Sequence, residues 1–291
     1  MFPEMLIQGN WSSPNDLLGH LGKEYFLFVL TGRFGNQLLG MSDAFLLSQL
    51  TKRRAVIFFG NGVPIPNWIH RLKDSTWFRI FLGTFDNPPP STGKVVLGQK
   101  DKTYLQSNSV FQGFTPSIAI HRKSGWLTST ESPFHLESKP DVAQLAITIR
   151  QGDYDKNPQL GVLPKSYYKR ALKLLASEVG NLEKVTIYVD NAGLVKKLSR
   201  SWLSKLGEIV YSDCALCDWE SIRRANFAIS SNSTFSYSAR LSRTDSTIFP
   251  QPFFLNYSCD LLDDNSITVP HSLAPKVRYA ILAFRKRISK G

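Results

Sequence analysis

The second half of the chain alternates short apolar segments with amphipathic ones, and this order limits the folds that it can adopt. The apolar, β-branched segments have the length of buried strands and lie at residues 145–149, 185–189, 208–211 and 227–230. Each is followed by a segment with helical spacing of apolar residues, at 165–178, 194–206, 219–225 and 236–242. Such strand–helix alternation predicts a parallel, doubly wound α/β sheet.

The first of these strands leads into the most informative turn, in the stretch Gln-Leu-Ala-Ile-Thr-Ile-Arg-Gln-Gly-Asp-Tyr at 144–154. Arg150 ends the strand with a permanently charged, planar set of donors. Gly152 permits a sharp turn before Asp153. Doubly wound sheets bind their ligands at the carboxyl ends of the strands, which makes Arg150 and Asp153 candidate site residues. The alternative, an Arg–Asp pair that only closes the loop, remains open.

Two further segments have the composition of anion-binding turns. The loop after the fourth strand, 231–236, reads Ser-Asn-Ser-Thr-Phe-Ser and enters a helix. In the first half, a strand at 25–30 ends in Thr-Gly-Arg-Phe-Gly-Asn-Gln and a helix begins at once. The glycine spacing fits neither the dinucleotide fingerprint nor the P-loop. Three candidate anion sites in a chain of net charge +12 point to a nucleotide ligand.

A chain of 291 residues predicts about two domains. The stretch 124–141 contains Pro133 and Pro140 and is typical of a linker, so the boundary is placed at Pro140, giving domains 1–140 and 141–291. In the first domain the pattern predicts a strand at 55–59, a helix at 70–82, and short strands at 94–97 and 117–120.

The basic charge admits three partners: nucleic acid, an anionic membrane surface or a phosphate-bearing substrate. No nucleic-acid-binding module is recognised, so nucleic acid is not expected. Residues 276–291 read as a basic amphipathic helix, either in peripheral contact with an anionic membrane or docked on the body of the protein. Without a long apolar run or a signal-peptide pattern, the chain is expected to be cytoplasmic, or peripheral to a membrane.

Cys214 and Cys217 form a lone C-x-x-C in a chain with three cysteines, which is too few for a disulfide framework. The pair follows an apolar run and precedes a helical one, a context that mildly resembles a redox motif. No second C-x-x-C completes a zinc site.

Three segments together resemble the fucosyltransferase superfamily. Residues 32–37, Gly-Arg-Phe-Gly-Asn-Gln, resemble the Gly-Gly-Leu-Gly-Asn-Gln motif of family 11 α-1,2-fucosyltransferases and, in the Arg-Phe form, the protein O-fucosyltransferases. Residues 149–154 and 163–168 resemble the family 11 stretch His-x-Arg-Arg-Gly-Asp-Tyr … Leu-Pro-x-x-Tyr-Tyr. Residues 226–236 resemble its third motif, Asn-Ile-Ile-x-Asn-Ser-Thr-Phe-Ser-Trp-Trp.

The resemblance implies a GT-B-like fold of two Rossmann-like domains, the first on the acceptor side and the second binding the GDP-sugar. It implies inverting, metal-independent transfer of fucose from GDP-fucose to a glycan hydroxyl, as in galactoside 2-α-L-fucosyltransferases, with no cofactor. Arg150 would bind the β-phosphate, and Asp218 would read the guanine edge. Asp190 matches an Asp that ends a family strand. The remaining donor-binding residues carried over are Gly35, Asn36, Ser233, Thr234 and Ser236.

The sequence departs from the family at several positions. Thr148 replaces a His and Gln151 replaces the second Arg, while Tyr237-Ser238 replaces Trp-Trp. Asp153 is the candidate base, although an Asp beside an Arg is held ionised and is a weak base. Asp153-Tyr154-Asp155 also spells the D-x-D of metal-dependent enzymes, but metal is not expected within this motif. A protein O-fucosyltransferase-like enzyme and a non-catalytic relative that binds a nucleotide sugar or glycan remain alternatives.

Overall fold

The computed structural model describes residues 6–30, 32–59, 65–72, 75–88, 94–96, 104–106, 126, 144–152, 154, 162–179, 182, 184–241, 246–251 and 267–270. The chain divides into two compact units, Met1–His135 and Leu136–Gly291. The predicted strand at 117–120 and the predicted helix at 276–291 lie outside the described residues. None of the described helices is both long and apolar enough to cross a membrane.

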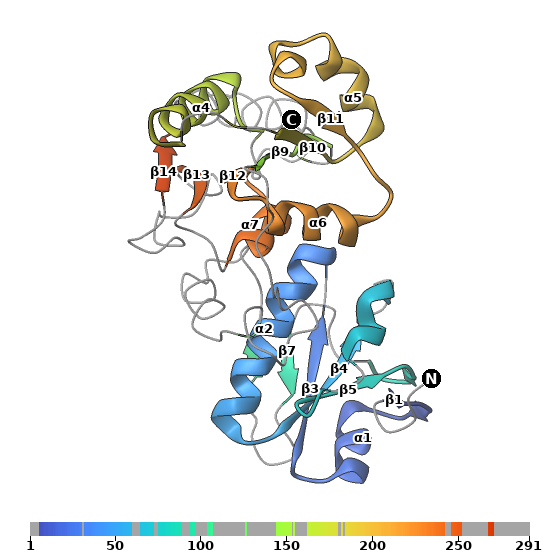
Figure 1. The fold of residues 1–291 in the computed structure, drawn as a ribbon. Helices are drawn as coiled ribbons and strands as arrows, with labels where there is room; N and C mark the ends of the chain where they lie inside the picture. The colour runs from blue at the N-terminus through green and yellow to red at the C-terminus, as the bar shows by residue number, and fades with distance from the viewer. Residues whose placement is uncertain are drawn as a thin grey trace, which may run out of the picture. The chain divides into compact units, whose positions relative to one another are not determined.

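The first unit is built on a six-stranded sheet (Figure 1). Four strands pair in parallel, in the order β1 (Leu6–Ile7), β5 (Phe78–Phe81), β4 (Arg54–Phe59) and β3 (Tyr25–Leu30). β7 (Lys94–Val96) and β8 (Tyr104–Gln106) continue it as antiparallel strands. The short strands β2 (Asn10–Trp11) and β6 (Thr84–Phe85) pair separately. The helical elements are α1 (Pro14–Leu21), α2 (Phe34–Thr51) and a 3-10 helix, Asn67–Leu72.

The helix predicted at 70–82 is wrong. The 3-10 helix ends at Leu72, and residues 78–81 form β5, which pairs with β4. Phe78, Ile80 and Phe81 are buried in the sheet, so this apolar run serves as a strand. A short apolar run does not distinguish helix from strand by its periodicity, which explains the error. The strands predicted at 55–59 and 94–97 are confirmed as β4 and β7.

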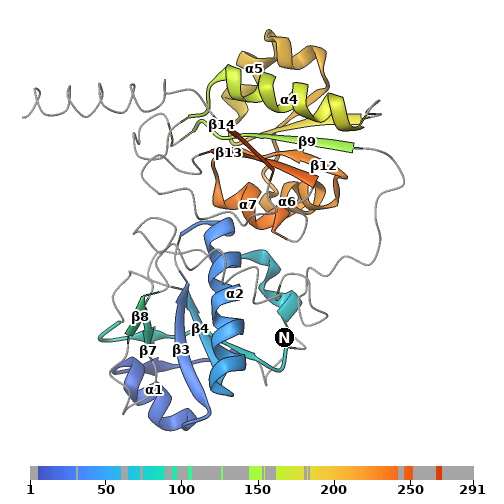
Figure 2. The same cartoon turned by 90° about the vertical axis from the view of Figure 1, so that its left-hand side faces the viewer.

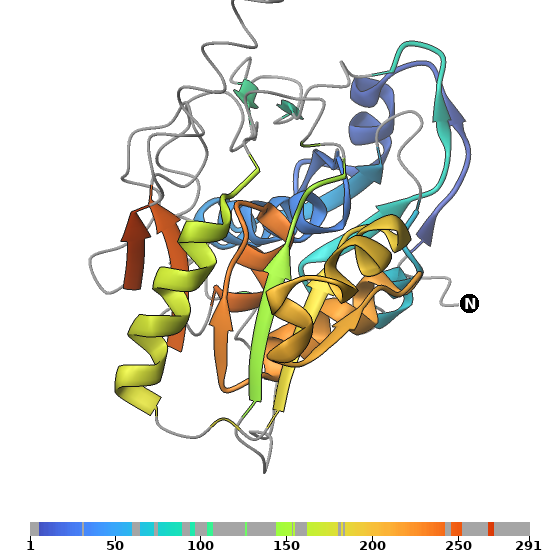
Figure 3. The same cartoon turned by 90° about the horizontal axis from the view of Figure 1, so that it is seen from above.

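The second unit contains a fully parallel sheet whose strands follow the order β11-β10-β9-β12-β13-β14 (Figure 3). Their bounds are Gln144–Ile149 for β9, Lys184–Val189 for β10, Glu208–Val210 for β11, Phe227–Ile229 for β12, Thr247–Gln251 for β13 and Ile267–Pro270 for β14. The chain adds strands on one side of β9, then returns and adds them on the other side. This is the Rossmann order.

The helices of the second unit cover both faces of its sheet. α4 (Lys165–Val179) and α5 (Ala192–Ser199) lie on one face, and α6 (Ala215–Arg224) and α7 (Thr234–Arg240) on the other (Figure 2). The predicted doubly wound sheet is therefore confirmed. With a Rossmann-like sheet in each unit, the chain has the α/β, GT-B-like fold that the sequence predicted.

Two details of the second unit differ from expectation. The helix predicted at 194–206 ends at Ser199, and Ser201 caps a separate 3-10 turn, Trp202–Lys205, through a bond from the Leu203 N–H. β13 and β14 were not predicted. Each contains a proline, Pro250 and Pro270, and proline inside a segment argues against a strand because it lacks the N–H donor of a sheet ladder.

Arg240 joins α6, α7 and β13. Its side chain is fully buried, and its guanidinium donates to the carbonyls of Ile222, Arg223 and Ala225 at the end of α6, the last at 2.6 Å. Its Nε donates to Thr247 Oγ1 at 2.7 Å, in the first residue of β13. A cation at a helix C-terminus is favoured by the helix dipole and satisfies carbonyls that have no intrahelical partner.

We predict that Arg240→Met lowers the free energy of unfolding by about 3 kcal/mol or more, because several buried carbonyls lose a charged donor at once. Lys173→Ala, at an exposed position on α4, is the matched control and should change stability by less than about 0.5 kcal/mol. Urea unfolding followed by circular dichroism measures both. Equal stability of the two variants would contradict the structural role of Arg240.

Candidate functional site

The candidate site lies where the second sheet changes its winding direction, between β9 and β12. These two strands pair directly: β9 begins the series β9-β10-β11 on one side of the sheet, and β12 begins the series β12-β13-β14 on the other. Arg150 follows the end of β9, and the loop 230–233 follows the end of β12. Because the strands are parallel, both segments lie at the same edge of the sheet. Crossover helices diverge at such a switch point and leave room for a ligand.

Thr148 fixes the loop after β12 to β9. Its Oγ1 accepts the Ser231 N–H at 2.6 Å and lies 3.2 Å from Ser231 Oγ, and the side chain is buried. Thr148 stands where the motif of the family 11 fucosyltransferases, which this segment resembles, has His. In this chain the Thr148 side chain instead forms a buried hydrogen bond with the loop after β12, at the edge of the sheet.

Ser236, the last of the predicted hydroxyl residues, likewise forms its hydrogen bonds within the protein. Its Oγ lies 3.0 Å from Ser231 Oγ and 3.2 Å from the carbonyls of both Ser231 and Ser233, and it is fully buried. These contacts make Ser236 a positioning residue. Ser233 is the N-cap of α7, where its Oγ accepts the Phe235 N–H at 3.2 Å. Thr234 is the most exposed of the three predicted hydroxyl residues.

Two neighbouring tyrosines of α4 tie the strand ends together. Tyr167 Oη lies within donor distance of two carbonyls, that of Ser230 after β12 at 2.7 Å and that of Ile248 in β13 at 3.1 Å. Tyr168 Oη donates to the Thr148 carbonyl at 3.3 Å. Burial raises the pKa of each tyrosine well above the ordinary value, so both remain neutral donors over the whole range of working pH. The Tyr-Tyr pair of the sequence motif therefore holds the edge on which the site is built.

Arg150 is held by Asp190, which follows β10. Arg150 Nε lies 3.2 Å from Asp190 Oδ2, with side-chain exposures of 20% and 10%. The guanidinium also lies over the Tyr154 ring, 5.3 Å from its centroid. Asp190 further accepts the Gln151 N–H at 3.3 Å and the Asn191 Nδ2 at 3.2 Å. Asp190, a predicted donor-binding residue, thus positions the arginine and its turn.

Gly152 is required by the close approach of this turn to Asp190. A Cβ at position 152 would lie 2.7 Å from Asp190 Oδ2, closer than a methyl group and a carboxylate oxygen can pack. Any side chain here would displace the carboxylate that holds Arg150.

Sequence reasoning missed Lys197 on α5. Its Nζ lies 3.4 Å from Gln151 Oε1, so the fold brings a second cation to the turn that follows β9. Lys197 is an ordinary exposed lysine of an amphipathic helix in the sequence, and no local signal marks it. It restores positive charge beside the position where Gln151 replaces the motif's second Arg.

Asp218 lies in the first turn of α6, the helix that follows β11. Ser212 Oγ donates to its Oδ1 at 2.9 Å. The carboxyl is half-buried, and this burial raises its pKa above the ordinary value, although the hydrogen bond from Ser212 acts in the opposite direction. A carboxylate kept partly desolvated in this way is a candidate for a functional group.

Tyr237 and Ser238, which stand where the family 11 motif has Trp-Trp, are both buried. Trp219 Nε1 donates to Ser238 Oγ at 3.0 Å, and the Tyr237 ring packs on Phe249 with centroids 5.9 Å apart. Both residues therefore contribute to packing in this chain.

Gly35 and Asn36 belong to the first unit, where they lie in the first turn of α2. Gly32 precedes them with a φ of +75°, and a Cβ on it would lie 2.5 Å from Asn36 Nδ2. Gln37 Nε2 donates to the Gly32 carbonyl at 3.2 Å, which closes the turn. The motif at 32–37 therefore forms the N-terminus of a long helix, at the carboxyl end of β3.

Asp153, the predicted base, lies outside the described residues, as does Asp155. In the described part of the chain, no group of three or more His, Cys, Asp or Glu residues could hold a metal ion. The expectations of a metal-free site and of Asp153 as a base stay predictions.

No protein-family model matches the sequence, and no curated protein sequence matches it either. The fold is similar to E. coli heptosyltransferase WaaC with ADP-2-deoxy-2-fluoro heptose, with 10% identity and a TM-score of 0.48 over 90% of this chain and 99% of that one. It is also similar to POFUT1 in complex with GDP, with 12% identity and a TM-score of 0.44 over 75% of this chain and 94% of that one. The fold described above rests on the strand order of this chain.

We predict that Thr148→Val destabilises the protein by about 1–3 kcal/mol, because the buried Ser231 N–H loses its acceptor while the side-chain volume is unchanged. Thr148→Ser keeps the hydroxyl and is the matched control, with a smaller loss. Urea unfolding of the two variants decides the matter, and a Val variant as stable as the Ser variant would remove this bond from the architecture of the site.

A second prediction concerns the pH dependence contributed by Asp218. Its raised pKa means that the folded chain holds this proton to higher pH than the unfolded chain, so ionisation costs the folded state. This loss of folding free energy is absent at pH values below the pKa of Asp218 in the unfolded chain, and it is complete above the pKa of Asp218 in the folded chain. Asp218→Asn should therefore be more stable than the wild type at pH 7, and the difference should shrink as the pH is lowered toward 4. Thermal unfolding between pH 4 and 8 tests the sign. A less stable Asn variant at pH 7 would contradict it.

Proposed function

We propose that the chain is an inverting glycosyltransferase that moves fucose from GDP-fucose to a hydroxyl of a glycan. The observation that carries the proposal is the placement of Arg150 and the hydroxyl-rich loop 231–234 at the switch point of a sheet in Rossmann order. A nucleotide diphosphate is the ligand whose charge and length fit an arginine, a helix start and backbone donors at that edge. The motif resemblance supports fucose as the sugar.

In this proposal Arg150 binds the diphosphate. Asp190 and the Tyr154 ring fix its direction, and 20% of the side chain remains exposed for a ligand. A guanidinium offers two parallel donors to a phosphate, a geometry that lysine cannot supply. Thr234 adds a hydroxyl, and Lys197 adds a second positive charge beside Gln151.

Asp218 is the residue proposed to select the base. Guanine presents adjacent N–H donors on its Watson–Crick edge, and an ionised carboxylate accepts both of them. Adenine lacks this pair of donors. The partial burial of Asp218 would strengthen such bonds, because electrostatic interactions gain strength where water is excluded.

The proposed reaction breaks the bond between the fucose anomeric carbon and the β-phosphate oxygen while the acceptor hydroxyl attacks from the opposite face. The acceptor loses its proton to a base, for which Asp153 is the candidate. Negative charge develops on the departing GDP, and Arg150 with backbone N–H groups would stabilise it without a metal ion. Gly35 and Asn36 are proposed to contact the sugar-phosphate from the first unit.

Two alternatives keep specific support. The Arg33-Phe34 form of the first motif favours a protein O-fucosyltransferase-like acceptor. The buried, hydrogen-bonded Thr148 in place of His favours a non-catalytic relative that binds the donor without turnover. Peripheral contact of residues 276–291 with an anionic membrane remains a further proposal.

The donor class is tested by measuring thermal shifts and dissociation constants for GDP, ADP, UDP and GDP-fucose. GDP and GDP-fucose should bind more tightly than ADP and UDP. Release of GDP from GDP-fucose in the presence of a glycan, with EDTA added, then separates a metal-independent enzyme from a binding protein. Preferential binding of UDP or ADP would overturn the donor assignment.

We predict that Arg150→Lys lowers kcat by roughly 10²-fold or more, as the loss of a preorganised donor does. GDP affinity should fall less than kcat, because the charge on GDP is largest during bond breaking. Gln151→Ala, next to it in the same turn, is the control and should keep most of the activity. Steady-state kinetics with folding checked by circular dichroism provide the measurement. A folded Arg150→Lys enzyme with near-native kcat would leave Arg150 only the loop-closing role.

A further inference from the structure

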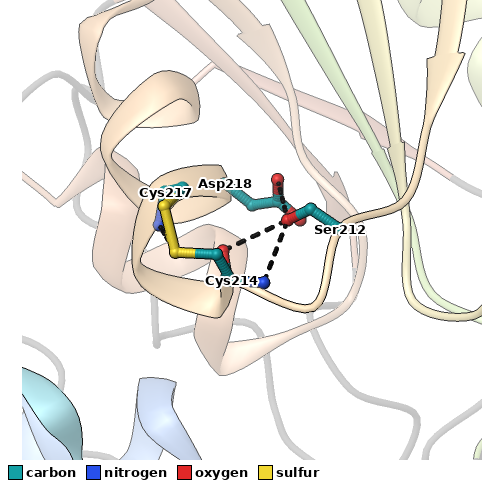
Figure 4. Close-up of a disulfide and its surroundings, with 4 residues drawn as sticks. All are labelled: Ser212, Cys214, Cys217 and Asp218. Carbon is teal, nitrogen blue, oxygen red and sulfur yellow. Dashed lines mark hydrogen bonds between the residues drawn. A yellow bond between two sulfur atoms is a disulfide. The ribbon is translucent and has the colours of Figure 1, made fainter.

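Cys214 and Cys217 form a disulfide in the first turn of α6 (Figure 4). Both residues are exposed. The sequence had left the pair as a lone C-x-x-C, and the structure places it next to Asp218 in the chain, on the helix proposed to select the nucleotide base.

The disulfide contributes little to global stability on physical grounds. It links residues only three apart, and the shortest loops constrain the unfolded chain least. The start of α6 is already held by other bonds, since the Asp218 N–H donates to the Cys214 carbonyl at 3.1 Å. An exposed disulfide is, in contrast, open to attack by an external thiolate.

The surroundings also suit the reduced form. Cys214 is the N-cap of α6, and the Cys217 N–H donates to its Sγ at 3.2 Å. The same donor and the positive end of the helix dipole would stabilise a thiolate on Cys214 after reduction. Stabilised thiolates are typical of dithiols that exchange rather than of structural cysteines.

Ser212 connects this pair to Asp218. Its hydroxyl accepts the Cys214 N–H at 3.3 Å and lies within donor distance of two acceptors, the Cys214 carbonyl at 3.2 Å and Asp218 Oδ1 at 2.9 Å (Figure 4). A single hydroxyl proton serves one acceptor at a time. A change in the position of Cys214 would therefore alter the hydrogen bond that orients the Asp218 carboxylate.

We propose that Cys214–Cys217 is a thiol–disulfide exchange site that sets the affinity of this protein for the guanine of its donor. The inference rests on the proposed function, in which Asp218 reads the base. An external dithiol transfers two electrons and two protons to the pair and becomes a disulfide itself, leaving two thiols at positions 214 and 217. The oxidised turn holds Ser212 and Asp218 in a preorganised arrangement, and reduction removes the cross-link that maintains it.

The experiment measures GDP and ADP dissociation constants of the full chain by calorimetry, first oxidised and then reduced with dithiothreitol. Alkylation and mass spectrometry establish the redox state in each sample. Reduction should weaken GDP binding roughly tenfold, as the loss of a well-oriented bond to a charged group does, and should leave the weaker ADP binding unchanged. A loss that is equal for both nucleotides would indicate general loosening of the fold and would overturn the proposal.

Two variants complete the test. The double variant Cys214→Ser/Cys217→Ser should bind GDP like the reduced wild type and should not respond to dithiothreitol. Cys259→Ser, which removes the third cysteine, should keep the full redox response. Equal GDP affinity of the oxidised and fully reduced wild type overturns the redox inference but leaves the proposed function intact. Absence of GDP binding in both redox states overturns the proposed function, and the inference with it.

Discussion

The site depends on one hydrogen-bonded junction, where Thr148 of β9 accepts the N–H of Ser231 at the end of β12. These two strands belong to opposite halves of the winding order, so their pairing defines the switch point of the sheet. Tyr167 and Tyr168 support the same edge, because their hydroxyl groups lie within donor distance of the carbonyls of Ser230, Ile248 and Thr148. The direction in which Arg150 and the loop 231–234 leave the sheet follows from this junction.

The polar residues of the edge divide by what they contact. Asp190, Ser233 and Ser236 form hydrogen bonds within the protein. Asp190 fixes the turn after β9, and the two serines fix the start of α7. Arg150, Thr234 and Asp218 keep partial exposure, and they are the groups proposed to contact the ligand. This division is physically coherent, because an anionic ligand is repelled by a carboxylate such as Asp190 but attracted by the arginine that it orients.

Much of the fold could be predicted because the buried strands of a parallel sheet are continuous apolar runs, as in β3, β4, β9 and β10. Prediction failed where that signal is interrupted or ambiguous. β13 and β14 were not predicted because they contain Pro250 and Pro270. The apolar run at 78–81 was predicted to be helical but forms β5. The position of Arg150 and of the hydroxyl loop at the sheet edge could be predicted, because the ends of parallel strands mark one edge of such a sheet. Lys197 and Ser212 could not be singled out from the sequence, because neither belongs to a recognised motif. Each was identified by a contact in the folded chain, Lys197 with Gln151 and Ser212 with Asp218.

The sequence by itself determined the α/β class, the doubly wound second sheet and the candidate residues at its carboxyl edge, because periodicity and strand-end position are local properties. Only the tertiary structure decided what each residue does there. It assigned Asp190 to hold Arg150, buried Ser236 inside the loop, brought Lys197 to Gln151 and joined Cys214 to Cys217. The reason is that a side chain's task depends on which groups lie within hydrogen-bonding distance, and packing of segments up to more than 80 residues apart sets those distances.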